Sequence, residues 1–121
     1  RMPSISDVTK FLKESSDALT SGYQGCYYFQ LDDDLYIVAS YFQDWDDPDR
    51  AGVVAKIASN PSALQCDYDY DWEFVMTPND VPFVAEIEID ITNLTKSAEY
   101  LLDEYAYIRK GLDLGKFKLA E

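Results

Sequence analysis

The sequence predicts an α+β fold, in which a five-stranded antiparallel sheet, mostly a meander, has an N-terminal and a C-terminal helix packed on one face. Two observations support this fold class. Apolar residues recur at helical spacing near both ends of the chain, and the segments between them either alternate apolar and polar residues or form short apolar runs bounded by turn residues. With 121 residues, 47% of them hydrophobic, the chain can bury one core, so we expect a single domain over residues 1–121.

The first helix is expected over residues 6–20. Ser6 is a suitable N-cap, and Gly22 follows the last turn. Its apolar residues fall on one side of the helix, which we expect to face the core. These residues are Ile5, Val8, Phe11, Leu12 and Leu19.

Residues 26–31 and 35–42 predict a hairpin, because two apolar runs flank the short acidic triplet 32–34. Both faces of this hairpin carry apolar side chains, and Tyr28 and Tyr36 fall on the second face. Such a face is either covered, for example by a second copy of the chain in a homodimer, or exposed as a tyrosine-rich binding surface.

A third strand is expected at residues 53–58, after an acidic loop at 43–50. The Asp47-Pro48 dipeptide in this loop favours a turn, so the simplest role of the loop is to connect two strands. Trp45 lies in the same loop, and tryptophan is among the residues that most often anchor a protein partner.

Residues 64–76 alternate apolar and polar side chains, and residues 83–91 repeat the pattern. Alternation of this kind is typical of strands with one apolar and one polar face. The short connection between the two segments predicts an antiparallel hairpin that pairs Phe74 with Ala85 and places the acidic residues of both strands on one surface. We call this surface the acidic face, and its residues are Asp67, Asp69, Asp71, Glu73, Glu86, Glu88 and Asp90.

The expected register puts acids opposite acids: Glu73 across from Glu86, Asp71 across from Glu88, and Asp69 across from Asp90. Three such like-charge pairs would cost ~1 to 3 kcal/mol, which a fold can bear. Two explanations of the acidic face remain open: a solvated surface that keeps the protein soluble, or a docking surface for a cationic partner.

The second helix is expected over residues 96–110, with Thr95 as its N-cap and Gly111 after its end. Residues 112–119 fit a short strand and a docking tail equally. The pattern does not fix the order of the strands in the sheet.

Charge is concentrated in the middle of the chain. Residues 14–95 contain seventeen acidic residues and two basic ones, Arg50 and Lys56, so this segment carries −15, whereas the whole chain carries −13. This excess argues against nucleic acid and against an anionic membrane as direct partners, because both require clustered Lys and Arg. No apolar run approaches the ~20 residues needed to span a bilayer. A basic protein surface is the natural complement.

The two cysteines, Cys26 and Cys66, form no CxxC motif. We expect both to be free and mostly buried, as in a reducing compartment, which favours a cytoplasmic location. Arg1 before Met2 resembles a cloning remnant ahead of a native start, so no signal peptide is expected.

The residues for most enzyme chemistry are missing. The chain has no histidine and no glycine-rich phosphate loop, so we expect neither catalysis nor a cofactor. Asp67, Asp69 and Asp71 copy the first ligands of an EF-hand, but Trp72 stands where that loop needs glycine and Pro78 where it needs glutamate. No metal site is therefore expected.

Two functional hypotheses remain. The favoured one is a small non-enzymatic inhibitor or modulator that docks its acidic face on a basic, nucleic-acid-binding protein surface, as anti-restriction, anti-CRISPR and immunity proteins can. Trp45, Tyr28 and Tyr36 would serve as its aromatic anchors. The alternative is a homodimeric chaperone-like or adaptor module that binds a peptide through its apolar, tyrosine-rich face. Strong salt sensitivity of binding would favour the first hypothesis.

Overall fold

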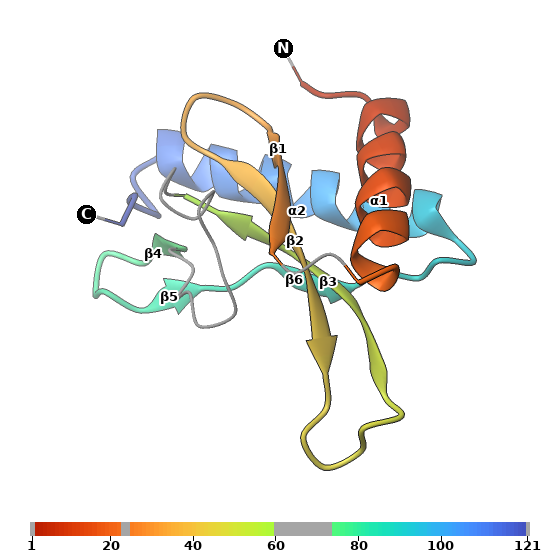
Figure 1. The fold of residues 1–121 in the computed structure, drawn as a ribbon. Coiled ribbons are helices and arrows are strands. Elements are labelled where there is room, and N and C mark those ends of the chain that lie inside the picture. Colours follow the sequence, from red (N-terminus) through yellow and green to blue (C-terminus); the bar gives the residue numbers. More distant parts are fainter. Residues whose placement is uncertain (1, 23–24, 60–73, 121) are drawn as a thin grey trace.

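Two helices and an antiparallel sheet make up the described part of the chain, which comprises residues 2–22, 25–59 and 74–120 of a computed structural model (Figure 1). The fold class is therefore α+β, as predicted. The elements in chain order are α1 (Ile5–Thr20), β1 (Cys26–Gln30), β2 (Tyr36–Gln43), β3 (Ala51–Ala58), β4 (Val75–Met76), β5 (Pro82–Phe83), β6 (Glu86–Glu88) and α2 (Leu94–Asp113).

The main sheet has four strands in the order β1-β2-β3-β6, and β4 pairs with β5 in a separate two-stranded sheet. The predicted meander is thus confirmed from β1 to β3, whereas the expected five-stranded sheet is not observed in the described residues. The backbone N–H of Ile57 donates to the carbonyl of Ala85 at 3.0 Å, and that of Ile89 donates to Val53 at 2.8 Å. These bonds place Ile87 opposite Ala55 on the core side of the sheet.

The expected register of the fourth and fifth strands is wrong where it can be compared. Val75 pairs with Phe83 and Met76 with Pro82, which is one residue away from a register that would pair Phe74 with Ala85. Ala85 instead bonds to β3. The expected pairs that involve residues 67–73 lie outside the described residues.

Both helices begin at an earlier cap than predicted. Ser4 caps α1, since its Oγ accepts a hydrogen bond from the backbone N–H of Asp7 at 3.1 Å. Asn93 caps α2 by accepting from the N–H of Lys96 at 3.2 Å, in place of Thr95.

Helix α2 also continues through Gly111, which was expected to follow its end. A Cβ atom at this position would collide with the ring of Phe117, so the glycine allows the tail to pack on the helix. Gly115, with a φ of 72°, then turns the chain back, and Lys118 exchanges two backbone hydrogen bonds with Met76 at 2.8 Å. Residues 112–119 thus complete the helix and form a docking tail.

The core lies between the helices and one face of the sheet. Both helices contact β3, and they also contact each other. Leu12 from α1, Leu101 and Ile108 from α2, and Ile37 and Ile57 from the sheet are buried in one cluster. This arrangement confirms that two helices pack against one face of an antiparallel sheet.

The second face of the sheet is partly buried as well. Tyr36, Val38 and Ala58 alternate with residues of the core face, yet they too are buried in the single chain. Tyr28 on the neighbouring strand is half exposed.

Cys26 is disulfide-bonded, so the expectation of a free thiol is wrong at this position. Cys66 lies outside the described residues. The argument from free thiols to a reducing compartment therefore does not hold. Neither helix in the described ranges has an apolar stretch long enough to cross a membrane.

Candidate functional site

Six of the ten residues predicted to bind a partner belong to the described residues: Glu86, Glu88, Asp90, Trp45, Tyr28 and Tyr36. The other four, Asp67, Asp69, Asp71 and Glu73, lie outside them. The six lie on strand β6, which is the last strand of the described sheet, in the loop after it, in the β2–β3 hairpin and on strand β1.

Glu86 and Glu88 face the only two basic residues of the acidic segment 14–95. Lys56 Nζ lies 3.4 Å from Glu86 Oε2, and Arg50 Nη2 donates to Glu88 Oε2 at 3.0 Å. Cation and acid come from adjacent strands, since Lys56 pairs with Glu86 in the β3–β6 ladder. The two carboxylates are about half exposed, so these pairs add only ~0 to 1 kcal/mol each, and both acids stay accessible.

Asp90 stabilises a turn at the start of α2. Its Oδ1 accepts hydrogen bonds from the hydroxyl and the backbone N–H of Thr92 at 2.6 and 2.9 Å. These bonds, led by the hydroxyl, lower the pKa of Asp90. The carboxylate therefore has a local structural role, and it remains exposed.

The β2–β3 hairpin extends beyond the rest of the sheet (Figure 1). Strand β1 pairs with β2 only as far as Ser40, and β6 pairs with β3 only from Val54 onward. Val53 still accepts a backbone hydrogen bond from Ile89, so the last two rungs of the hairpin, which join residues 42–43 to 51–52, form a two-stranded ribbon. We call residues 43–51 at its end the hairpin tip.

Hydrogen bonds within the hairpin tip fix its loop. The backbone N–H of Asp44 donates to the carbonyl of Arg50 at 2.9 Å, and the N–H of Arg50 donates to Asp47 at 2.9 Å. Asp44 Oδ1 accepts from the N–H of Asp46 at 2.8 Å, and the Gln43 side-chain amide donates to the carbonyl of Pro48 at 2.8 Å. The loop is thus an ordered turn whose aspartates satisfy the backbone, which is the turn role predicted for it.

Arg50 holds the tip to the sheet. Its guanidinium lies 5.4 Å from the centroid of the Phe42 ring, 3.0 Å from Glu88 and 3.6 Å from Asp44. Gly52 leaves room for this arrangement, because a Cβ there would lie 3.2 Å from the Phe42 ring and 3.3 Å from the Glu88 carboxylate. One cation therefore links the ribbon, the tip and strand β6.

Trp45 projects into solvent from the hairpin tip. It is 89% exposed, the highest value among the large apolar residues of the described ranges. An exposed indole contributes nothing to the core, whereas tryptophan is enriched in the small sets of residues that dominate protein interfaces.

Tyr28 and Tyr36 have different accessibility. Their rings meet edge to face at a centroid distance of 6.3 Å, but Tyr28 is 50% exposed and Tyr36 only 8%. Tyr36 therefore supports Tyr28, which presents the accessible ring. Their assignment to partner binding stays a prediction.

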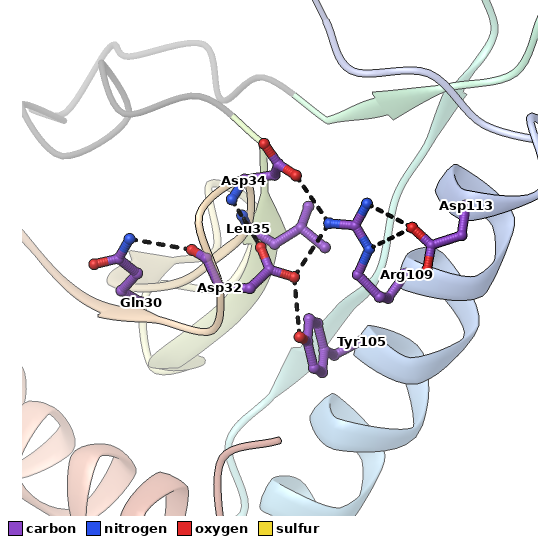
Figure 2. A network of polar contacts seen from close by, with 7 residues as sticks. All are labelled: Gln30, Asp32, Asp34, Leu35, Tyr105, Arg109 and Asp113. Carbon is purple, nitrogen blue, oxygen red and sulfur yellow. Dashed lines mark hydrogen bonds and ion pairs between the residues drawn. The ribbon is translucent and has the colours of Figure 1, made fainter. Parts of the chain in front are cut away.

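A polar cluster that sequence reasoning missed lies between the β1–β2 turn and α2 (Figure 2). Arg109 Nη1 donates to Asp34 Oδ2 at 2.8 Å and to Asp32 Oδ2 at 3.4 Å, and Arg109 Nη2 donates to Asp113 Oδ1 at 2.9 Å. The hydroxyl of Tyr105 donates to Asp32 Oδ2 at 2.9 Å. We call these five residues the Arg109 cluster. Helical spacing of Tyr105, Arg109 and Asp113 was the one signal for it in the sequence.

The environment of the Arg109 cluster changes three pKa values. Burial raises the pKa of Asp32, but hydrogen bonds from the backbone N–H of Asp34, the Tyr105 hydroxyl and other donors outweigh burial and lower it overall. Burial, together with the bond to Asp32, raises the pKa of Tyr105 to about 12. The hydrogen bond to Asp34, with smaller contributions from Asp113 and Asp32, raises the pKa of Arg109. All three shifts favour the charge states that hold the cluster together.

A cavity of about 440 Å³ lies beside the Arg109 cluster, lined in part by Met2, Ala106, Lys110 and Leu114. Arg109 is already bonded to three carboxylates, so it has little capacity left for an anionic ligand. The cluster is therefore a structural link between the turn and α2, and we assign no ligand to the cavity.

The described residues contain no group of three or more acidic or cysteine side chains placed to hold a metal ion. Exposed side chains lie at the hairpin tip, with Trp45, and on strand β6, with Glu86 and Glu88. No protein-family model, no curated protein and no solved structure matches this chain.

Proposed function

We propose that this chain is a small acidic binding protein that inhibits or modulates another protein by docking on its basic surface. The partner surface is one that binds nucleic acid, since a nucleic-acid site already presents the clustered Lys and Arg that carboxylates can occupy. The acidic face defined from the sequence and the hairpin tip are the contact regions. No catalytic residue is needed.

One observation carries this proposal: the acidic side chains far outnumber the cations that are available to compensate them. Arg50 and Lys56, the only basic residues of segment 14–95, are already paired with Glu88 and Glu86. Several exposed carboxylates make no ion pair within the described ranges, namely Asp33, Asp46, Asp47, Asp49 and Asp90. Uncompensated charge of one sign destabilises a compact chain by self-repulsion, so a role outside the fold explains it better than a structural one.

The alternative, a homodimeric chaperone-like or adaptor module, rests on the exposed ring of Tyr28. It predicts binding through apolar contacts that persist at high salt. Measuring the affinity for a partner as a function of salt concentration therefore distinguishes the two functions.

The test starts from a partner captured from a host lysate and purified. Its affinity is measured for wild type and for Asp69→Lys/Asp71→Lys, with Glu99→Lys/Asp103→Lys on an exposed part of α2 as a control of equal charge change. We expect the first variant to bind at least ~10-fold more weakly and the control to change little, because a contact charge costs more than a remote one. Association should also slow as salt rises from about 50 to about 500 mM, since the screening length shrinks from roughly 14 to 4 Å.

Competition gives the second measurement. Duplex DNA or RNA should displace the wild-type protein from its partner without binding the protein itself. Equal loss of affinity in both charge variants would mean that only net charge matters, and binding unaffected by salt and by both variants would reject the acidic docking model in favour of the apolar alternative.

A further inference from the structure

We infer that the hairpin tip is the anchor of this docking, and that Trp45 enters a pocket on the partner whose rim is formed by arginine side chains. The inference rests on the proposed function and adds the element, the residue and the chemistry of the contact.

The first argument is the shape of the β2–β3 hairpin. Its outer two rungs have no neighbouring strand in the described part of the chain, so the tip can enter a recess that the flat sheet cannot. Figure 1 shows the tip as the part of the hairpin farthest from both helices. A projecting element suits a concave site such as a nucleic-acid groove.

The second argument is that the tip is ordered before binding. Its backbone is held by the hydrogen bonds of Asp44, Asp47 and Arg50, and the ion pair of Arg50 with Glu88 joins it to β6. A partner therefore meets a preformed loop, and little conformational entropy is lost on association. Such rigid presentation of one large aromatic ring is a recurrent property of anchor residues.

The third argument identifies the partner's chemistry. The aromatic ring of Phe42 already has a cation from this chain, Arg50 at 5.4 Å, but the ring of Trp45 has none among the described residues. Asp46, Asp47 and Asp49 beside it make no ion pair in the same ranges. Indole is the aromatic group that attracts cations most strongly, and a guanidinium can stack on it while it bonds to a neighbouring carboxylate. Arginine thus fits the tip better than lysine.

The same charges disfavour two other occupants. A second copy of this chain would bring an identical row of aspartates against the tip, and each chain carries −13. A lipid bilayer would have to desolvate those aspartates at the depth where the indole settles, and its anionic headgroups would repel them.

The experiment uses 5-fluorotryptophan-labelled protein and two peptides of equal charge, deca-arginine and deca-lysine. The resonance of Trp45 is assigned by its loss in Trp45→Phe, since the chain has two tryptophans. We expect deca-arginine to shift this resonance and to bind Trp45→Ala about two- to fivefold more weakly than wild type, as cation–π energies at exposed sites imply, with a smaller loss for deca-lysine. With the purified partner, Trp45→Ala should lose affinity about 30-fold or more, as for anchor residues.

Ile91→Ala is the matched control, because it truncates another exposed apolar side chain, which lies between β6 and α2 and not in the hairpin tip. Both variants should melt like wild type. Unchanged binding of the partner by Trp45→Ala would overturn the inference, and the proposed function would survive if Asp69→Lys/Asp71→Lys still lost affinity. A shift of the Trp45 resonance on zwitterionic vesicles, or self-association that depends on Trp45, would also overturn it in favour of a membrane or a second copy.

Discussion

At the scale of single residues, Arg109 gives the acidic β1–β2 turn a structural role. It bonds to Asp32 and Asp34 from the β1–β2 turn and to Asp113 from its own helix. The carboxylates of the turn, which the sequence presents only as the end of a hairpin, thereby attach the sheet to α2. Because Arg109 holds Asp32 and Asp34 in a partly buried cluster, these two carboxylates contribute less to recognition than the exposed hairpin tip.

The pH dependence of stability should reveal this link. The pKa of Asp32 is lower in the folded chain than its ordinary value of about 3.9, so its contribution is fully present above that pH and is lost as the pH falls through the lower folded value. Asp32→Asn should therefore lower the unfolding free energy by about 1–3 kcal/mol at pH 7 and by less near pH 3, where the carboxyl of the unfolded chain is mostly protonated. Urea unfolding at the two pH values measures the difference.

Asp33→Asn provides the control, because this neighbouring side chain is exposed and makes no ion pair within the described residues. It should change the unfolding free energy by less than about 0.5 kcal/mol. If Asp32→Asn lowers the unfolding free energy equally at both pH values, neutral hydrogen bonding and packing stabilise the turn, and the charge of Asp32 does not.

At the scale of residues, sequence pattern located the aromatic and acidic side chains but not their environment. Trp45 and Tyr36 both read as aromatic anchors, yet one is exposed and the other buried. The difference follows from position in the fold, since Tyr36 lies between β1 and β3 in the sheet whereas Trp45 lies in the loop beyond the paired strands.

At the scale of elements, a glycine near the end of a helix can either terminate the helix or leave room for a side chain that packs against it. The sequence predicts a helix end at Gly111, but the helix passes through it, and the absence of a side chain leaves room for the Phe117 ring. That ring forms an aromatic group with Phe83 at 5.0 Å and Tyr107 at 5.7 Å. The true turn residue is Gly115, whose φ is 72°.

Gly111→Ala should therefore destabilise the protein, although alanine normally favours a helix interior by about 1 kcal/mol. The added methyl group collides with Phe117 and should lower the unfolding free energy by about 1–3 kcal/mol. A double-mutant cycle with Phe117→Ala checks the cause, because the same change should be neutral or stabilising once the ring is removed. If Gly111→Ala lowers the unfolding free energy equally with and without the Phe117 ring, the cause lies in the helix and not in the contact with Phe117.

Strand pairing was the part of the fold that the pattern could not determine. The alternation of residues 83–91 determines which side chains share a face of the sheet. It does not determine the partner, because any strand with apolar residues on the same face would fit. The available clue was charge: Lys56 and Arg50 are alone among seventeen acids, and β6 satisfies both by lying next to β3. Helices and the first three strands were predictable because their periodicity and caps are local.

At the scale of the whole molecule, net charge should oppose folding. The chain carries −13, and its basic residues between 14 and 95 are already paired, so repulsion among the remaining carboxylates should exceed the attraction that salt would screen. We expect the melting temperature to rise by a few degrees as sodium chloride increases from about 10 to about 300 mM.

The variant Asp33→Asn/Asp46→Asn removes two carboxylates that make no ion pair in the described part of the chain. It should melt higher than wild type at low salt and respond less to added salt. A melting temperature that falls with salt would instead mean that ion pairs such as those of Arg109 dominate the electrostatics.

The position of α2 has a consequence for the order in which the chain folds. Strands β1 to β3 are neighbours in sequence and can pair early, but Ile37 and Ile57 on their core face are buried together with Leu101 and Ile108, which the ribosome adds much later. Contacts over such long separations form slowly, and a growing chain would expose an apolar sheet in the meantime. The carboxylates of the hairpin tip are synthesised together with these strands, so we expect their repulsion to keep incomplete chains apart until the last helix arrives.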